Sequence, residues 1–229
     1  MSILVDRDVF NPNVAASDLS LVERFRMHDV AKISDAMAKY GTFQSCVKPL
    51  EDSMRICGTA VTVQCEKGDW KALERAAERV GKGEVMVVDA GGFESVCVCG
   101  IELVEKLSAA GAAGLVVNGA VRDSLAIIKS GFPVFARTTC NVKTEVGKAV
   151  KVNVPINGAG LVVYPGDLIV GDDDGVVAVP YYDFERVLKL TDAKLEHELA
   201  NQAKISAGAV MTVLYGCEAK IDKWREAKA

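Results

Sequence analysis

Hydrophobic and polar positions along the chain follow patterns that change from helix to strand and back. Apolar residues in 18–41 recur at helical spacing and the segment closes on Gly41, so it predicts one helix. Residues 55–65 alternate as in a strand, and residues 69–80 predict a helix that Asp69 caps. The order of these elements indicates an α/β fold.

A strand–helix–strand unit occupies the middle of the chain. Residues 83–92 predict a buried strand, residues 94–111 a helix that stops at Gly111, and residues 113–123 the next strand. With short connections this is a βαβ unit, whose strands lie parallel and end at the same edge of the sheet. Ligands of α/β proteins bind outside this edge, where glycines let backbone N–H groups approach an anion. Two clusters should therefore face one cavity there: Asp89, Gly91 and Gly92, and Asn118, Gly119, Arg122 and Asp123.

The pattern changes again after residue 150. Short β-branched runs separated by turn sequences predict an antiparallel or mixed β half over residues 150–180. The turn GDDDG at 171–175 is acidic, but it lacks the spaced ligands of a calcium loop and is interpreted as a structural turn or a subunit contact. Residues 183–207 predict an amphipathic helix of about 37 Å. Because this length exceeds what one domain needs, we expect the helix to cross to a neighbouring subunit.

Composition narrows the class of protein. The 229 residues are half apolar, carry a formal charge of −4 with acids and bases interspersed, and predict one domain over 1–229. The chain has no basic stripe of the kind that binds nucleic acid, so we expect no nucleic acid as a direct partner. No apolar run approaches the roughly 18 residues of a membrane span, and the first residues do not resemble a signal sequence. We therefore expect a cytoplasmic protein without a membrane as a direct partner. Seven scattered cysteines indicate reduced thiols, and Cys97 and Cys99 are expected to be buried rather than to bind metal. His28 is expected to be a surface or packed side chain.

Arg122 and Asp123 place a cation and an anion side by side where a buried strand stops. One interpretation makes Asp123 the cap of a short helix over residues 124–131 and leaves Arg122 on the surface. In the other, the carboxylate takes a hard divalent cation while the planar guanidinium binds a carboxylate or keto-acid oxygen. Such a pair suits a 2-oxo acid and its enolate. A Schiff-base mechanism is disfavoured, because Lys129 lies in the short helix and is expected to be solvated.

The motifs from residue 114 to residue 180, among them GLVVNGAVRDS, GFPVFAR and the PGDLIVGDDDG stretch, resemble one family. It joins the regulator of ribonuclease activity A to the class II 4-hydroxy-4-methyl-2-oxoglutarate and 4-carboxy-4-hydroxy-2-oxoadipate aldolases, and the resemblance covers about residues 20–210. It implies a swivelling β/β/α domain, assembled as a homotrimer or a hexamer with active sites between subunits. It also implies that Arg122 holds a pyruvyl group, that Asp123 ligates Mg²⁺ or Mn²⁺, and that a glutamate of the C-terminal helix reaches in from a neighbour: Glu198, or alternatively Glu196. The expected substrate-binding residues are Arg122, Gly100, Ile101, Glu102, Leu103, Gly91 and Gly92.

Two positions depart from the aldolase pattern. Residue 126 is alanine where the motif has an acid, and Ile101 stands where many aldolases have an acid, with Glu102 one step further. The resemblance implies retro-aldol cleavage of a 4-hydroxy-2-oxo acid to pyruvate, with oxaloacetate decarboxylation as a side activity. The alternative is a non-catalytic trimer that binds and regulates a ribonuclease complex.

Overall fold

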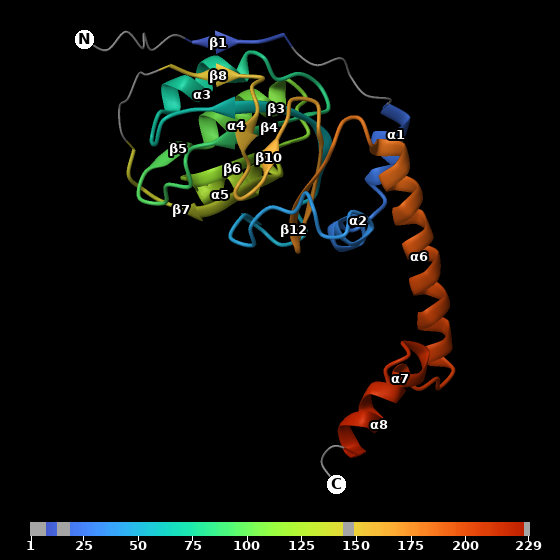
Figure 1. Ribbon diagram of the computed structural model, residues 1–229. Helices are drawn as coiled ribbons and strands as arrows, with labels where there is room; N and C mark the ends of the chain where they lie inside the picture. The colour runs from blue at the N-terminus through green and yellow to red at the C-terminus, as the bar shows by residue number, and fades with distance from the viewer. Residues whose placement is uncertain (1–7, 13–18, 144–148, 227–229) are drawn as a thin grey trace, which may run out of the picture.

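A mixed sheet forms the centre of the protein in the computed structural model, which describes residues 8–12, 19–143 and 149–226 (Figure 1). The strand order is β1 (Val9–Phe10), β8 (Lys151–Val152), β3 (Ile56–Gln64), β4 (Glu84–Asp89), β6 (Gly114–Val121), β7 (Val134–Thr139) and β2 (Lys48–Pro49). The four central strands, β3, β4, β6 and β7, are parallel. They are linked by α3 (Trp70–Ala77), α4 (Ile101–Ala109) and α5 (Ser124–Ser130). The predicted parallel core and the α/β fold class are confirmed.

Both faces of this sheet are covered. In β4, Met86 and Val88 pack into one apolar cluster with α3 and α4, while Val85 and Val87 pack into a second cluster on the other face. Alternate residues of a strand point to opposite faces, so a strand buried on both sides reads as a continuous apolar run. The second cluster includes the hairpin of β9 (Ile156–Asn157) and β10 (Val162–Val163).

The β half over residues 150–180 is mixed, within the predicted antiparallel or mixed arrangement: β8 pairs parallel with β1, and the other strands pair antiparallel. Strand β11 (Leu168–Asp172) pairs antiparallel with both β3 and β12 (Gly175–Val179). The predicted long helix is also present as α6 (Phe184–Ser206), with Asp183 and Ala207 at its cap positions. In Figure 1 it runs away from the sheet and carries α7 (Met211–Leu214) and α8 (Glu218–Glu226) beyond its end. No helix in the described part of the chain is long and apolar enough to span a membrane.

The expected single helix over residues 18–41 is wrong. The structure has two helices, α1 (Leu19–Phe25) and α2 (Val30–Ala36), which pack on α6 and on the β11–β12 ladder. A carboxylate from a distant turn, Asp172 Oδ2, accepts a hydrogen bond of 2.8 Å from Val30 N and so starts the second helix. Gly41 does not cap it: a Cβ there would lie 2.5 Å from Ala178 O, so the glycine permits close approach to β12.

The expected helix over residues 94–111 is correct only in its second part. Residues Cys97–Cys99 form strand β5, which pairs parallel with the end of β6. All three are buried, and helix α4 begins after Gly100. The apolar run is long enough for a helix. Its first part forms a strand instead, because it pairs with Ala120 and Val121 at the carboxyl end of β6.

Candidate functional site

Arg122 and Asp123 lie directly after the carboxyl end of β6. Asp123 has left-handed backbone angles, φ 59° and ψ 31°, which turn the chain into α5. Its side chain makes no cap bond to α5. Instead its Oδ2 accepts a hydrogen bond of 3.3 Å from Ile101 N at the start of α4. Asp123 therefore accepts a hydrogen bond from the first N–H of a helix, as the cap interpretation predicts, but this helix is α4 and not α5.

The neighbouring strand end holds the pair in position. The N–H of Arg122 donates to Cys99 O at 2.9 Å, and Arg122 Nε lies 3.4 Å from Asp123 Oδ2. The side chains are 33% and 35% exposed, so Arg122 is a half-buried group rather than the surface residue of the cap interpretation. A Cβ on Gly100 would lie 2.3 Å from Asp123 Oδ2 and 3.0 Å from Arg122 Cγ. Only glycine fits there without displacing one of the two charged side chains.

Arg122 borders a pocket of about 340 Å³ at the start of α4. The first N–H groups of a helix have no acceptor within the helix and carry its positive dipole end, so Glu102 and Leu103 present backbone donors suited to a carboxylate. The residues that matter for this pocket are Gly100, Glu102, Leu103, Arg122, Trp70 and Lys143. Three of the four predicted 100–103 residues thus share the pocket with Arg122. The fourth, Ile101, lies with Asp123 and Ala126 on an adjoining open hollow.

The Asp123 carboxylate suits a largely hydrated divalent cation. Its Oδ1 makes no hydrogen bond to the described residues. Within the same residues no group of three or more histidine, cysteine, aspartate or glutamate side chains could hold a metal. Mg²⁺ keeps several of its waters and is often bound through only one or two carboxylates. The single free oxygen of Asp123 suits such an ion, although the described residues do not supply a full set of protein ligands.

The two cysteines of β5 are buried thiols in the pocket wall. Burial raises the pKa of Cys99 to about 12 and raises that of Cys97 as well, where Arg122 partly opposes it. Cys97 Sγ also lies 3.1 Å from Val142 O, as a thiol donor would. Both cysteines are buried, as the sequence predicted.

The cluster at the end of β4 holds loops together. Asp89 is 7% exposed and accepts hydrogen bonds from Gly91 N, Asn118 Nδ2 and Asn157 N, at 2.9, 3.3 and 3.3 Å. Arg137 donates in turn to Asn118 Oδ1 at 3.3 Å. These contacts tie the β9–β10 hairpin to the edge of the sheet.

Gly91 and Gly92 do not share the Arg122 pocket. Gly91 N donates to Asp89, and Gly92 N donates to Asn118 O at 3.1 Å, so neither offers a free N–H to an anion. Asp89 and Gly91 instead line a separate hollow of about 800 Å³ with Lys67 and Lys151. The expectation of one cavity for both clusters is wrong, because the network around Asp89 uses up its polar groups.

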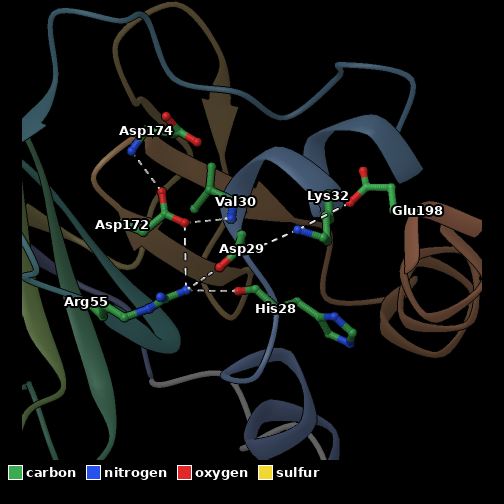
Figure 2. A network of polar contacts seen from close by, with 8 residues as sticks. All are labelled: His28, Asp29, Val30, Lys32, Arg55, Asp172, Asp174 and Glu198. Atoms are coloured by element: carbon green, nitrogen blue, oxygen red, sulfur yellow. Dashed lines mark hydrogen bonds and ion pairs between the residues drawn. The ribbon is translucent and has the colours of Figure 1, made fainter. Parts of the chain in front are cut away.

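Glu198 lies on α6 and does not line the Arg122 pocket. Its Oε2 is 3.5 Å from Lys32 Nζ of α2, and Figure 2 shows this pair beside the network of Asp29, Arg55 and Asp172. Glu196 is exposed on the same helix. Within one chain, neither glutamate joins the site, and Glu198 as a residue supplied by a neighbour stays a prediction.

The remaining sequence interpretations can be placed. The GDDDG turn is structural: Asp172 Oδ2 accepts from Val30 N and its Oδ1 from Asp174 N, as Figure 2 shows. His28 is 6% exposed and lies 2.9 Å from Asp192 Oδ1, so it is a packed histidine. Lys129 is exposed, as expected. Trp70 and Lys143 of the pocket were not anticipated, because no motif connects two residues so far apart in sequence.

Comparison with known proteins shows the family of the chain. A family model described as RraA-like, Aldolase/RraA, matches residues 30–178. A protein of Halalkalibacterium halodurans, provisionally named 4-hydroxy-4-methyl-2-oxoglutarate aldolase, is 35% identical over 196 residues, which cover 84% of this chain and 92% of that protein.

Solved structures give the same result. An uncharacterized protein from Pseudomonas syringae matches with a TM-score of 0.78 at 26% identity, over 88% of this chain and 95% of the other. The RNA-processing inhibitor RraA from Thermus thermophilus matches with a TM-score of 0.61 at 26% identity, over 67% and 93%. The resemblance found in the sequence is confirmed, and the chain belongs to the RraA-like (Aldolase/RraA) family.

Proposed function

We propose that the protein cleaves a 4-hydroxy-2-oxo acid to pyruvate by a retro-aldol reaction that depends on Mg²⁺ or Mn²⁺. The observation that carries this proposal is the adjacent placement of the Arg122 guanidinium and the Asp123 carboxylate, which line one hollow together, while Arg122 also borders the pocket at the start of α4. The name of the 35% identical relative supports the same reaction class and suggests 4-hydroxy-4-methyl-2-oxoglutarate as the first substrate to test.

The residues have separate roles in this reaction. Arg122 and the first N–H groups of α4 bind the carboxylate and the 2-oxo oxygen of the substrate. A divalent cation at Asp123 would stabilise the negative charge that develops on the enolate oxygen. The C4 hydroxyl loses its proton to a base as the C3–C4 bond breaks, which leaves a carbonyl product and the enolate of pyruvate. Protonation of the enolate at C3 then gives pyruvate. Oxaloacetate decarboxylation forms the same enolate and is the proposed side activity.

Glu198 of a neighbouring subunit is the proposed base, acting through a water molecule in a homotrimer or hexamer. Helix α6 buries Val187 and Leu188 near its start, whereas Leu199 near its end is 56% exposed. An exposed apolar position on a projecting helix suits contact with another copy of the chain.

Subunit complementation tests this arrangement. Asp123→Asn chains unfolded and refolded together with Glu198→Gln chains should regain part of the activity that each lacks, because some sites then combine an intact Asp123 with an intact Glu198. Simple mixing of the two preformed assemblies is the control. Inactive mixed assemblies would exclude the shared site.

A coupled assay for pyruvate tests the reaction itself. The protein is supplied with 4-hydroxy-4-methyl-2-oxoglutarate or oxaloacetate, with Mg²⁺ and then with EDTA. We expect turnover that EDTA abolishes and Mg²⁺ restores. Turnover that survives EDTA would contradict the proposed metal dependence.

Regulation of a ribonuclease complex by a non-catalytic trimer is the second candidate. Ile101 and Ala126 next to Asp123 favour it, since they leave the carboxylate without the acidic neighbours of the aldolase pattern. No pyruvate from either substrate, together with inhibition of a ribonuclease complex in vitro, would favour this function.

A further inference from the structure

The Arg122 pocket contains a second cation that the proposed reaction does not use. Lys143 Nζ lies 3.7 Å from the centre of the Trp70 ring, and both side chains line the pocket with Arg122. Trp70 opens α3, and Lys143 forms an isolated bridge with Cys97 of β5. The indole therefore holds the lysine at a defined place on the pocket wall.

Both groups have unused donor capacity. Lys143 makes no ion pair with any carboxylate in residues 8–12, 19–143 and 149–226, although many other basic side chains there do. The Trp70 Nε1 atom is buried and has no hydrogen-bond partner in the same residues. A buried donor without an acceptor is costly, and here it lies beside Lys143, an exposed cation without a carboxylate partner among the described residues. The two together mark a place where an anion would be stabilised.

The lining of the pocket presents both cations to one ligand, because Arg122 and Lys143 border the same hollow at the start of α4. A 2-oxo acid bound through Arg122 and the start of α4 would direct its other end along the pocket wall to Trp70 and Lys143. Glu74 and Glu102 also border the pocket, but both are exposed, where solvent weakens their repulsion.

We propose that Trp70 and Lys143 form a distal subsite that selects 2-oxo acids carrying a second carboxylate. This inference rests on the proposed function, since it assumes that the 2-oxo acid end binds at Arg122. The ammonium of Lys143 pairs with the distal carboxylate while it remains over the indole ring. The Trp70 N–H is the second donor. The two residues are thus specificity-determining positions outside the Arg122–Asp123 pair.

A matched pair of probes tests the subsite by binding. 2-Oxoglutarate and 2-oxopentanoate have the same chain length and differ in whether the far end is a carboxylate or a methyl group. The chain has two tryptophans, Trp70 and the exposed Trp224, so Trp70 is the only indole in a Trp224→Phe background. Titration calorimetry in the presence of Mg²⁺ gives the affinities, and fluorescence reports the surroundings of Trp70.

We expect 2-oxoglutarate to bind at least about tenfold more tightly than 2-oxopentanoate and to change the Trp70 emission. Lys143→Gln should reduce this preference to about twofold or less, and Lys143→Arg should keep most of it. Glu74→Gln should act in the opposite direction and raise the affinity for 2-oxoglutarate alone. Lys82→Gln, which removes an exposed lysine just before β4, at the amino end of the sheet, is the control and should leave both affinities unchanged.

The outcomes separate the subsite from the proposed function. Equal affinities in the parent protein, or the same preference in Lys143→Gln as in the parent, would overturn the subsite while the 2-oxo acid site stands. If neither probe binds to the parent, the site at Arg122 itself is wrong, and the subsite fails with it.

Discussion

Two aspartates, Asp123 and Asp172, each accept a hydrogen bond from the first N–H of a helix that belongs to another part of the chain. Asp172 Oδ2 lies 2.8 Å from Val30 N of α2, and Asp123 Oδ2 lies 3.3 Å from Ile101 N of α4. The side chain of Asp172 is 10% exposed and that of Asp123 is 35% exposed. The same residue type makes the same contact in two very different environments.

The two carboxylates differ in how many of their oxygens already accept hydrogen bonds. Asp172 uses both oxygens, since its Oδ1 accepts from Asp174 N at 2.9 Å and Arg55 stands 3.8 Å from its Oδ2. Asp123 uses one oxygen and leaves the other without a partner among the described residues. A saturated carboxylate stabilises the fold, whereas an unsaturated one beside a half-buried arginine can bind a ligand. The capacity left over, rather than the presence of an acid, therefore marks the candidate site.

Asp123→Asn should have the largest effect, and on activity. The amide can still accept from Ile101 N but cannot supply a negative charge to a cation, so we expect turnover to fall by at least about 100-fold. The free energy of unfolding should change by less than about 1 kcal/mol. Pyruvate release and urea denaturation measure the two effects. A variant that melts earlier and keeps its rate would reduce Asp123 to a helix cap.

Asp172→Ala should show the reverse pattern. It leaves Val30 N and Asp174 N without their acceptor, so we expect a loss of about 2 kcal/mol in the free energy of unfolding. Turnover per folded molecule should be unchanged. The neighbouring Asp174→Ala is the matched control, because Asp174 enters the network through its backbone. Unchanged stability in Asp172→Ala would remove the distinction between the two aspartates.

Gly100→Ala tests how closely the Arg122–Asp123 pair is positioned. The new methyl group would lie 2.3 Å from Asp123 Oδ2, so the carboxylate or the start of α4 must move. Displacements of this size at a reacting centre lower rates strongly, and we expect kcat/KM to fall by about tenfold or more. Gly81→Ala is the control, because its nearest atom, Glu84 Oε2, is 3.4 Å away. An equal rate in both variants would show that the pair tolerates displacement.

Local signals in the sequence were sufficient for much of the fold. The parallel core followed from apolar runs, and α6 followed from its apolar stripe, because both depend on neighbouring residues. The break between α1 and α2 could not be predicted, since the acceptor for Val30 N is Asp172, 142 positions away. Strand β5 was missed because its pairing with β6 is a tertiary contact that overrides a helix-like apolar run.

The site divides in the same way. The adjacency of Arg122 and Asp123 is a property of the chain and could be predicted. The helix that Asp123 contacts is 22 positions away, and the pairing of Trp70 with Lys143 depends on how β5 and α3 meet. The saturation of Asp89 by Asn118 and Asn157 is equally invisible in a sequence. The type and order of residues identify candidate side chains. Whether such a side chain can bind a ligand depends on its hydrogen-bond partners in the folded protein.

The smallest effect is expected at Asp29, on the surface beside Asp172. Hydrogen bonds from Lys32 and then from Arg55 lower the pKa of Asp29 below its ordinary value of 3.8. A carboxyl group with a lowered pKa in the folded state stabilises the protein above the unfolded pKa, and this contribution is lost as the pH falls through the folded-state value. Asp29→Asn should therefore flatten the fall in stability below about pH 4, measured as the midpoint of urea unfolding. Lys32→Met should reproduce part of this flattening, because it removes the first of the two donors. An unchanged pH profile in Asp29→Asn would confine the stabilising network to Asp172 and leave the surface charges around it without effect.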